Sequence, residues 1–181
     1  MPCSGFGEVG LQTSFWLGLD PLHQLTSYGG YSRMRVEMYA TDNRWYSAEY
    51  DEFFVGGEYS EYPLSVYGYS GDAGDHLYRS NGLGFSTSDS GLQSSLAMMM
   101  KGGWWYSGSD YASLNGVHVI TGHQNEMTGF YWNSPDPQPG QPPYPPTTSS
   151  LVGVSPGRLE ISRIMVTKPS SGQGAGGGGY Y

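Results

Sequence analysis

The clearest pattern in the chain is an alternation of apolar and polar residues over YSRMRVEMY, residues 31–39. One face of this segment carries Met34, Val36 and Met38, and the other carries Arg33, Arg35 and Glu37. Because successive side chains of a β-strand point to opposite faces, the pattern predicts a strand with one buried face.

Three further segments are predicted to be strands. AEYDEFFVGG (residues 48–57) and EYPLSVYGYSG (61–71) follow as short strands that end in glycine-rich turns. Near the end of the chain, GRLEISRIMVTKP (157–169) predicts a returning strand, with apolar residues at Leu159, Ile161, Ile164 and Val166.

FWLGLDPLHQLTS, residues 15–27, predicts a short helix. Asp20 is suited to the N-cap, Pro21 to the first helical position, and Leu22 with Leu25 forms one apolar face. Together these elements predict an α+β fold with an antiparallel sheet, short helices and a large loop-rich region.

Two segments differ in composition from the rest. Residues 134–148 contain seven prolines, which favour extended conformations and cannot hold a sheet ladder. Residues 170–181 form a glycine-rich tail that we expect to be disordered. We therefore expect a folded domain over residues 1–169, interrupted by the proline-rich segment at about residues 134–148.

The charge and cysteine content limit the function classes. The formal net charge is −8, with 8 basic against 16 acidic residues, so the basic footprint of a nucleic-acid binder is missing. The same balance argues against binding to anionic membranes, and no apolar run is long enough to insert into one. Cys3 is the single cysteine, so no intrachain disulfide can form, and the N-terminus has no visible signal peptide.

Several motifs, in order, resemble the fibrinogen C-terminal domain family, which includes ficolins, tenascins and angiopoietin-like proteins. They are GFGE (5–8), FWLGLDPLHQLTS (15–27), YSRMRVEM (31–38), AEYDEFFVG (48–56), LSVYGYSGDAGD (64–75), NGLGFST (81–87), KGGWWY (101–106) and LNG (114–116). The strong part of the resemblance covers about residues 5–116, and the part of the family domain before GFGE is missing. The resemblance implies a secreted, non-catalytic recognition module.

The resemblance also shows what this chain lacks. The family brackets KGGWWY with two cysteines, and the matching positions here are Leu96 and Ser109. The family's calcium loop is reduced to FSTSDSGLQSSL, where Asp89 is the single carboxylate. Because Ca²⁺ takes six to eight oxygen ligands, we expect no calcium site here, and no other metal or cofactor.

The acetyl-sugar pocket of ficolin-like members maps to Met100, Asp110 and Glu126, none of which offers the same stacking face or donor. Acetyl-sugar recognition is therefore not supported. We interpret Trp104 and Trp105, which follow Gly102 and Gly103, as anchors of the hydrophobic core. The alternative is an aromatic platform that stacks on a ligand. The candidate ligand-binding residues are Met100, Trp104, Trp105, Tyr106, Asp110 and Glu126.

Other chemistries are weakly indicated. Asp72 and Asp75 lie in a glycine-rich turn, where capping of the turn is favoured over cation binding. His118 and His123 could share a metal with Glu126, but one such pair is weak evidence for zinc. The chain has no GxSxG turn and no phosphate-binding loop, so we expect no enzyme.

The leading interpretation is an extracellular recognition module for a cell-surface or matrix protein or a glycan. The loop-rich face carrying residues 97–109 and 116–132 would engage the partner. The alternative is a structural or adhesive secreted protein built on a degenerate scaffold, and a third interpretation is a nonfunctional or fragmentary gene product. The sequence does not indicate an oligomeric state.

Overall fold

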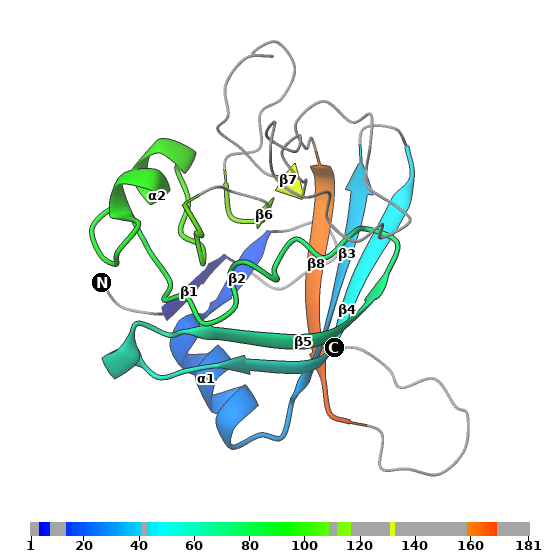
Figure 1. The fold of residues 1–181 in the computed structure, drawn as a ribbon, viewed down its shortest axis with the longest axis horizontal. Coiled ribbons are helices and arrows are strands. Elements are labelled where there is room, and N and C mark those ends of the chain that lie inside the picture. Colours follow the sequence, from blue (N-terminus) through cyan, green and yellow to red (C-terminus); the bar gives the residue numbers. More distant parts are fainter. Residues whose placement is uncertain are drawn as a thin grey trace, which may run out of the picture.

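The computed structural model describes residues 4–7, 14–40, 43–108, 112–116, 131–132 and 159–169 (Figure 1). Its centre is a four-stranded antiparallel sheet in the order β5-β4-β3-β8. These strands are β3 (Arg33–Ala40), β4 (Trp45–Val55), β5 (Leu64–Gly71) and β8 (Leu159–Thr167). The predicted α+β class with an antiparallel sheet is confirmed.

The remaining elements are short. Two strand pairs lie outside the main sheet: β1 (Ser4–Gly7) with β2 (Phe15–Gly18), and β6 (Ala112–Ser113) with β7 (Tyr131–Trp132). The helices are α1 (Leu19–Ser27), the 3₁₀ turn η1 (Glu58–Ser60) and α2 (Ser94–Met100). Among the described residues, no helix has the length and apolar character needed to cross a membrane.

The alternation over β3 becomes the two faces of the sheet, as predicted. Met34, Val36 and Met38 are buried at 4%, 0% and 0% exposure, so this face belongs to the hydrophobic core. The opposite face carries half-buried charged side chains. The pattern therefore sets which side of the sheet faces solvent.

The predicted returning strand is also confirmed, as β8. It pairs with β3 along its length, with Val36 opposite Ile164 and Glu37 opposite Arg163. Figure 1 shows this late segment beside the early strand β3, although more than a hundred residues of chain separate them. Leu159 is buried, while Ile161 is 44% exposed, so only part of the predicted apolar set reaches the core.

The start of the predicted helix is wrong. Residues 15–18 form β2, and α1 begins at Leu19 after Gly18, which has a φ of 97° and occupies the N-cap. A residue without Cβ adopts this left-handed conformation at low cost, which allows the strand to turn directly into the helix. Asp20 does not cap the helix; its carboxylate accepts a hydrogen bond from the Tyr62 hydroxyl.

The proline-rich segment 134–148 and the tail 170–181 lie outside the described residues. The proposed division of the chain at residue 169 therefore stays a prediction.

Candidate functional site

The predicted aromatic residues of KGGWWY lie in the hydrophobic core. Trp104, Trp105 and Tyr106 are 2%, 3% and 2% exposed. The Trp105 indole N–H donates to the Tyr62 carbonyl oxygen at 2.7 Å, and its ring meets Phe85 edge-on, with centroids 4.9 Å apart. The interpretation of both tryptophans as core anchors is therefore confirmed, and neither ring offers an exposed face for a ligand.

Glycines make this burial possible. A Cβ on Gly102 would lie 2.1 Å from the Asn115 carbonyl oxygen, and one on Gly103 would lie 2.6 Å from the Phe85 ring. Both approaches are closer than carbon atoms tolerate, so the chain needs glycine at these two positions. The Asn115 side-chain amide donates to the Gly103 carbonyl at 3.2 Å, which fixes the two segments together.

Met100 is the last residue of α2 and is 1% exposed, so it also belongs to the core. The two preceding methionines point outward instead: Met98 is 63% exposed and Met99 51%. Leu92, just before the helix, is 86% exposed. Leu92, Met98 and Met99 are therefore the exposed apolar side chains in and just before α2, and we call these three residues the α2 patch.

Asp110 and Glu126 lie outside the described residues, as do His118 and His123. The six candidate ligand-binding residues are thus four buried side chains and two that the structure does not describe, and their role in binding stays a prediction.

Asp89 is exposed, and its carboxylate accepts a hydrogen bond from the Thr87 hydroxyl at 2.8 Å. No group of three or more acidic, histidine or cysteine side chains suited to a metal occurs among the described residues.

The glycine-rich turn after β5 is held by its two aspartates. The Asp72 carboxylate accepts the Ser47 backbone N–H at 2.7 Å, and the Asp75 carboxylate accepts the Tyr50 hydroxyl at 2.7 Å. Desolvation by burial raises the pKa of Asp75, although its hydrogen bonds oppose the shift. The Asp75 carboxylate also accepts hydrogen bonds from the backbone of Leu77 and Tyr78, which agrees with the expected turn-capping role, whereas Asp72 ties the turn to β4.

The same turn carries a buried histidine. His76 is 7% exposed, and its ring meets Trp132 edge-on at 5.9 Å. Desolvation lowers its pKa to about 4, so the ring is neutral at physiological pH. The Trp132 indole N–H donates to the Gly74 carbonyl at 3.0 Å, which ties β7 to this turn.

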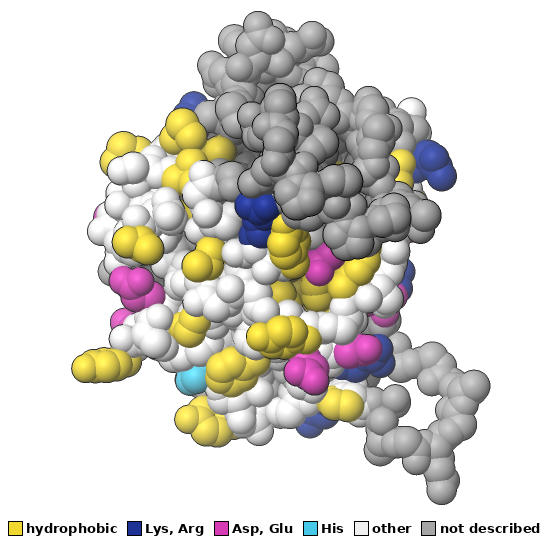
Figure 2. All heavy atoms as spheres, in the orientation of Figure 1, with side chains coloured by type: hydrophobic (Ala, Val, Ile, Leu, Met, Phe, Trp, Pro, Cys, Tyr) yellow, Lys and Arg dark blue, Asp and Glu magenta, His cyan; other side chains and the backbone are white. Residues whose placement is uncertain are grey.

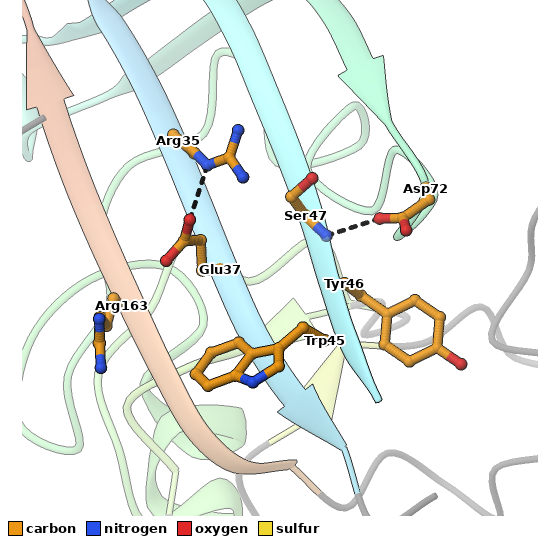
Figure 3. Close-up of a pocket in the computed structure, with 7 residues that line it drawn as sticks. All are labelled: Arg35, Glu37, Trp45, Tyr46, Ser47, Asp72 and Arg163. Carbon is orange, nitrogen blue, oxygen red and sulfur yellow. Dashed lines mark hydrogen bonds and ion pairs between the residues drawn. The ribbon is translucent and has the colours of Figure 1, made fainter. Parts of the chain in front are cut away.

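A hollow of about 430 Å³ lies on the solvent face of the main sheet (Figure 3). Trp45, Tyr46 and Ser47 of β4 contribute to its wall. The other lining residues are Arg35 and Glu37 of β3, Arg163 of β8, and Asp72 after β5. We call this site the sheet hollow.

The sheet hollow combines an aromatic ring with balanced charges. Trp45 is 49% exposed; it packs against Tyr39 at 5.2 Å between centroids and has the Arg163 guanidinium 5.7 Å from its ring centre. The Arg35 Nε donates to the Glu37 carboxylate at 2.9 Å, and Arg35 also pairs with Glu49. An exposed ring beside fixed donors and acceptors can hold a ligand by stacking and hydrogen bonding.

Sequence reasoning missed this hollow. Trp45, Asp72 and Arg163 are far apart in the chain, and only the strand register brings them together, with Glu37 opposite both Ser47 and Arg163. The one signal available was the charged face of residues 31–39.

On the face in Figure 2, hydrophobic side chains are scattered over the described surface and form no single large patch.

Comparison with known proteins gives the family. The sequence profile for the C-terminal globular domain of fibrinogen beta and gamma chains matches residues 3–137. The chain belongs to the fibrinogen C-terminal domain family. The resemblance stated from the motifs is therefore confirmed.

Three relatives illustrate the similarity of this chain to known proteins of the family. Tenascin-R of Gallus gallus is 37% identical over 131 residues, which is 71% of this chain and 9% of tenascin-R. Fibrinogen-like protein A of Apostichopus parvimensis is 41% identical over 136 residues, 72% of this chain and 46% of the relative. Angiopoietin-related protein 7 of Bos taurus is 38% identical over 133 residues, 71% of this chain and 38% of the relative. The chain thus spans less than half the length of each.

Solved structures agree on the fold. The fibrinogen-like globe domain of human ANGPTL2 superposes with a TM-score of 0.69 at 29% identity, covering 91% of this chain and 69% of that domain. Lamprey fibrin D-dimer, solved with the peptide Gly-His-Arg-Pro-amide, gives a TM-score of 0.71 at 22% identity, and covers 97% of this chain and 59% of that one. At that identity the second match supports the fold alone.

Proposed function

We propose that this chain is an extracellular, non-catalytic recognition module that binds a protein or glycan partner at a cell surface or in the matrix. The observation that carries the proposal is membership of the fibrinogen C-terminal domain family, with relatives among the tenascins and angiopoietin-related proteins. The proposal assigns to this chain the extracellular recognition role that fibrinogen-like domains have in proteins of this family.

Because the aromatic run is buried, we propose that the partner contacts other side chains than the residues first indicated. Trp104, Trp105 and Tyr106 stabilise the fold, so a partner would contact side chains that reach solvent. The α2 patch is one such surface and the sheet hollow is the other. They differ in chemistry, because the first is apolar and deformable and the second is aromatic and charged.

The experiment is a binding screen with the secreted full chain against arrays of cell-surface ectodomains, matrix proteins and glycans. Hits would then be retested with two surface variants: Trp45→Ala in the sheet hollow, and the double substitution Met98→Ser with Met99→Ser in the α2 patch. Tyr67→Ala is the matched control, because Tyr67 is a 56% exposed aromatic on β5 outside both surfaces.

A specific hit that one surface variant abolishes, and that Tyr67→Ala retains, supports the proposal and locates the site. The absence of any hit on all three arrays would contradict recognition and would favour a structural or adhesive role. In that role the folded chain would contribute cohesion without a defined partner.

A further inference from the structure

Three described tyrosines have an acidic residue directly beside them in the sequence: Tyr50, Tyr59 and Tyr62. Sequence alone favours Tyr50 as the most acidic context, since Glu49, Asp51 and Glu52 surround it. Tyr59 follows Glu58, and Tyr62 follows Glu61. An acid-flanked tyrosine in a secreted protein is an acceptor for modifying enzymes only if its hydroxyl reaches solvent.

The three tyrosines differ in how far their side chains are exposed to solvent. Tyr50 is 1% exposed and its hydroxyl donates to Asp75, while Tyr62 is 4% exposed and its hydroxyl donates to Asp20. Tyr59 has a relative exposure of 105%, so its whole ring lies outside the protein surface. Its hydroxyl has no hydrogen-bond partner in the described part of the chain.

The backbone presents Tyr59 at the tip of the connection between β4 and β5. Tyr59 is the middle residue of η1, a turn closed by hydrogen bonds from Ser60 N–H to Gly57 O at 3.1 Å and from Glu61 N–H to Glu58 O at 2.9 Å. Glu58 and Glu61 are exposed as well. An enzyme approaching this tip would therefore meet a phenol between two solvated carboxylates.

We propose that Tyr59 is an O-sulfation site, modified during passage through the secretory pathway. The inference rests on the proposed extracellular function, because sulfation of tyrosine needs that route. In the reaction, the phenolic oxygen attacks the sulfur of a nucleotide phosphosulfate. The new oxygen–sulfur bond replaces the bond from sulfur to the nucleotide phosphate, the proton passes to a base of the transferase, and the nucleotide bisphosphate leaves.

The flanking carboxylates give the site its selectivity. An enzyme that binds a polyanionic nucleotide donor carries basic groups around its cleft, and acidic residues beside the acceptor are attracted to such groups. Tyr28 shows the contrast: it is 83% exposed, but no acidic residue lies within five positions of it. Exposure without an acidic context should leave Tyr28 unmodified.

The test uses the full chain expressed behind a secretion leader in animal cells and purified from the medium. Intact mass spectrometry, with peptide fragmentation that preserves labile groups, measures added SO₃ and its position. The variants are Tyr59→Phe, Glu58→Gln and, as the matched control, Tyr28→Phe. Treatment with alkaline phosphatase distinguishes sulfate from phosphate, because only the phosphate ester is hydrolysed.

We expect the secreted wild-type chain and Tyr28→Phe to carry one SO₃ group, Tyr59→Phe to carry none, and Glu58→Gln to be modified in a smaller fraction of molecules. An unmodified wild-type chain, a group that persists in Tyr59→Phe, or a group removed by phosphatase would overturn the proposal. An unsulfated chain that still binds an array partner overturns this inference and leaves the recognition function intact. A sulfated chain that binds no array partner would support this inference and contradict the recognition function.

Discussion

In the main sheet, β3 pairs with β4 and β8 over most of its length, and backbone hydrogen bonds set the position of each residue. Residues 85–106, which we call the aromatic loop region, have only α2 and two isolated bridges, Ser86 with Trp104 and Thr87 with Ser90. Beside a few backbone hydrogen bonds, ring contacts hold this region together: Trp104 meets Trp105 at 5.2 Å, and Phe85 contacts both Trp16 and Trp105. The sheet depends on its backbone, and the aromatic loop region depends on particular side chains.

The largest expected effect of this difference is at Trp105. Replacing it with alanine removes a buried ring and leaves the Tyr62 carbonyl without its donor, so the free energy of unfolding should fall by about 3–5 kcal/mol. Trp45→Ala, at the exposed end of β4, should cost about 1 kcal/mol or less. Urea denaturation followed by circular dichroism measures both.

A comparison with Trp104 tests how much the indole hydrogen bond of Trp105 contributes to stability. Its indole N–H is buried and has no hydrogen-bond partner among the described residues, unlike that of Trp105. Since phenylalanine has no donor, Trp104→Phe should be less destabilising than Trp105→Phe, by about 1–2 kcal/mol. Equal losses for the two variants would mean that ring packing alone decides stability in this region.

A second comparison concerns two glycines. A Cβ on Gly102 would collide with backbone, the Asn115 carbonyl, whereas a Cβ on Gly82 would meet no atom within 4 Å. Gly82→Ala should therefore cost only the strain of its positive φ, about 1–2 kcal/mol. Gly102→Ala should cost more than that, measured by thermal unfolding of the two variants. Similar melting temperatures would show that the 101–106 segment can shift without loss.

These differences explain what the sequence could predict. Alternation over residues 31–39 and the apolar positions of residues 157–169 led to β3 and β8, because a ladder converts a period of two directly into faces. The resemblance to the family supplied the overall fold. The buried place of Met100 and the meeting of Trp45 with Arg163 were not predictable, since each depends on which segments pack together and no local pattern encodes that.

The pH dependence of stability tests the turn after β5, which contacts β4 and β7. The folded-state pKa of His76 is about 4, against about 6.5 in an unfolded chain, so only the unfolded state gains a proton between these values. Stability should therefore be complete above about pH 6.5 and fall by about 3 kcal/mol as the pH drops to about 4. The raised pKa of Asp75 acts in the opposite direction at the acid end of this window, because the folded state takes up that proton first.

The measurement is urea denaturation of wild type and His76→Gln at several pH values between 7 and 4. The variant should be less stable at pH 7, yet lose less stability on acidification. An identical pH slope for the two proteins would assign the acid sensitivity to other groups.

Calcium should have the smallest effect, even though it would act on the aromatic loop region. Asp89 is the one carboxylate in the segment after Thr87, it lies exposed, and it already accepts the Thr87 hydroxyl. One monodentate carboxylate falls far short of the six to eight oxygens that Ca²⁺ takes, so binding at millimolar calcium should be negligible. The melting temperature should then change by less than about 1 °C between millimolar Ca²⁺ and excess chelator. Asp89→Asn should behave like wild type in both conditions.

A rise in melting temperature of several degrees that the chelator reverses would contradict this expectation. If Asp89→Asn kept that rise while Asp72→Asn lost it, the cation would be bound at the turn after β5 and not in the aromatic loop region.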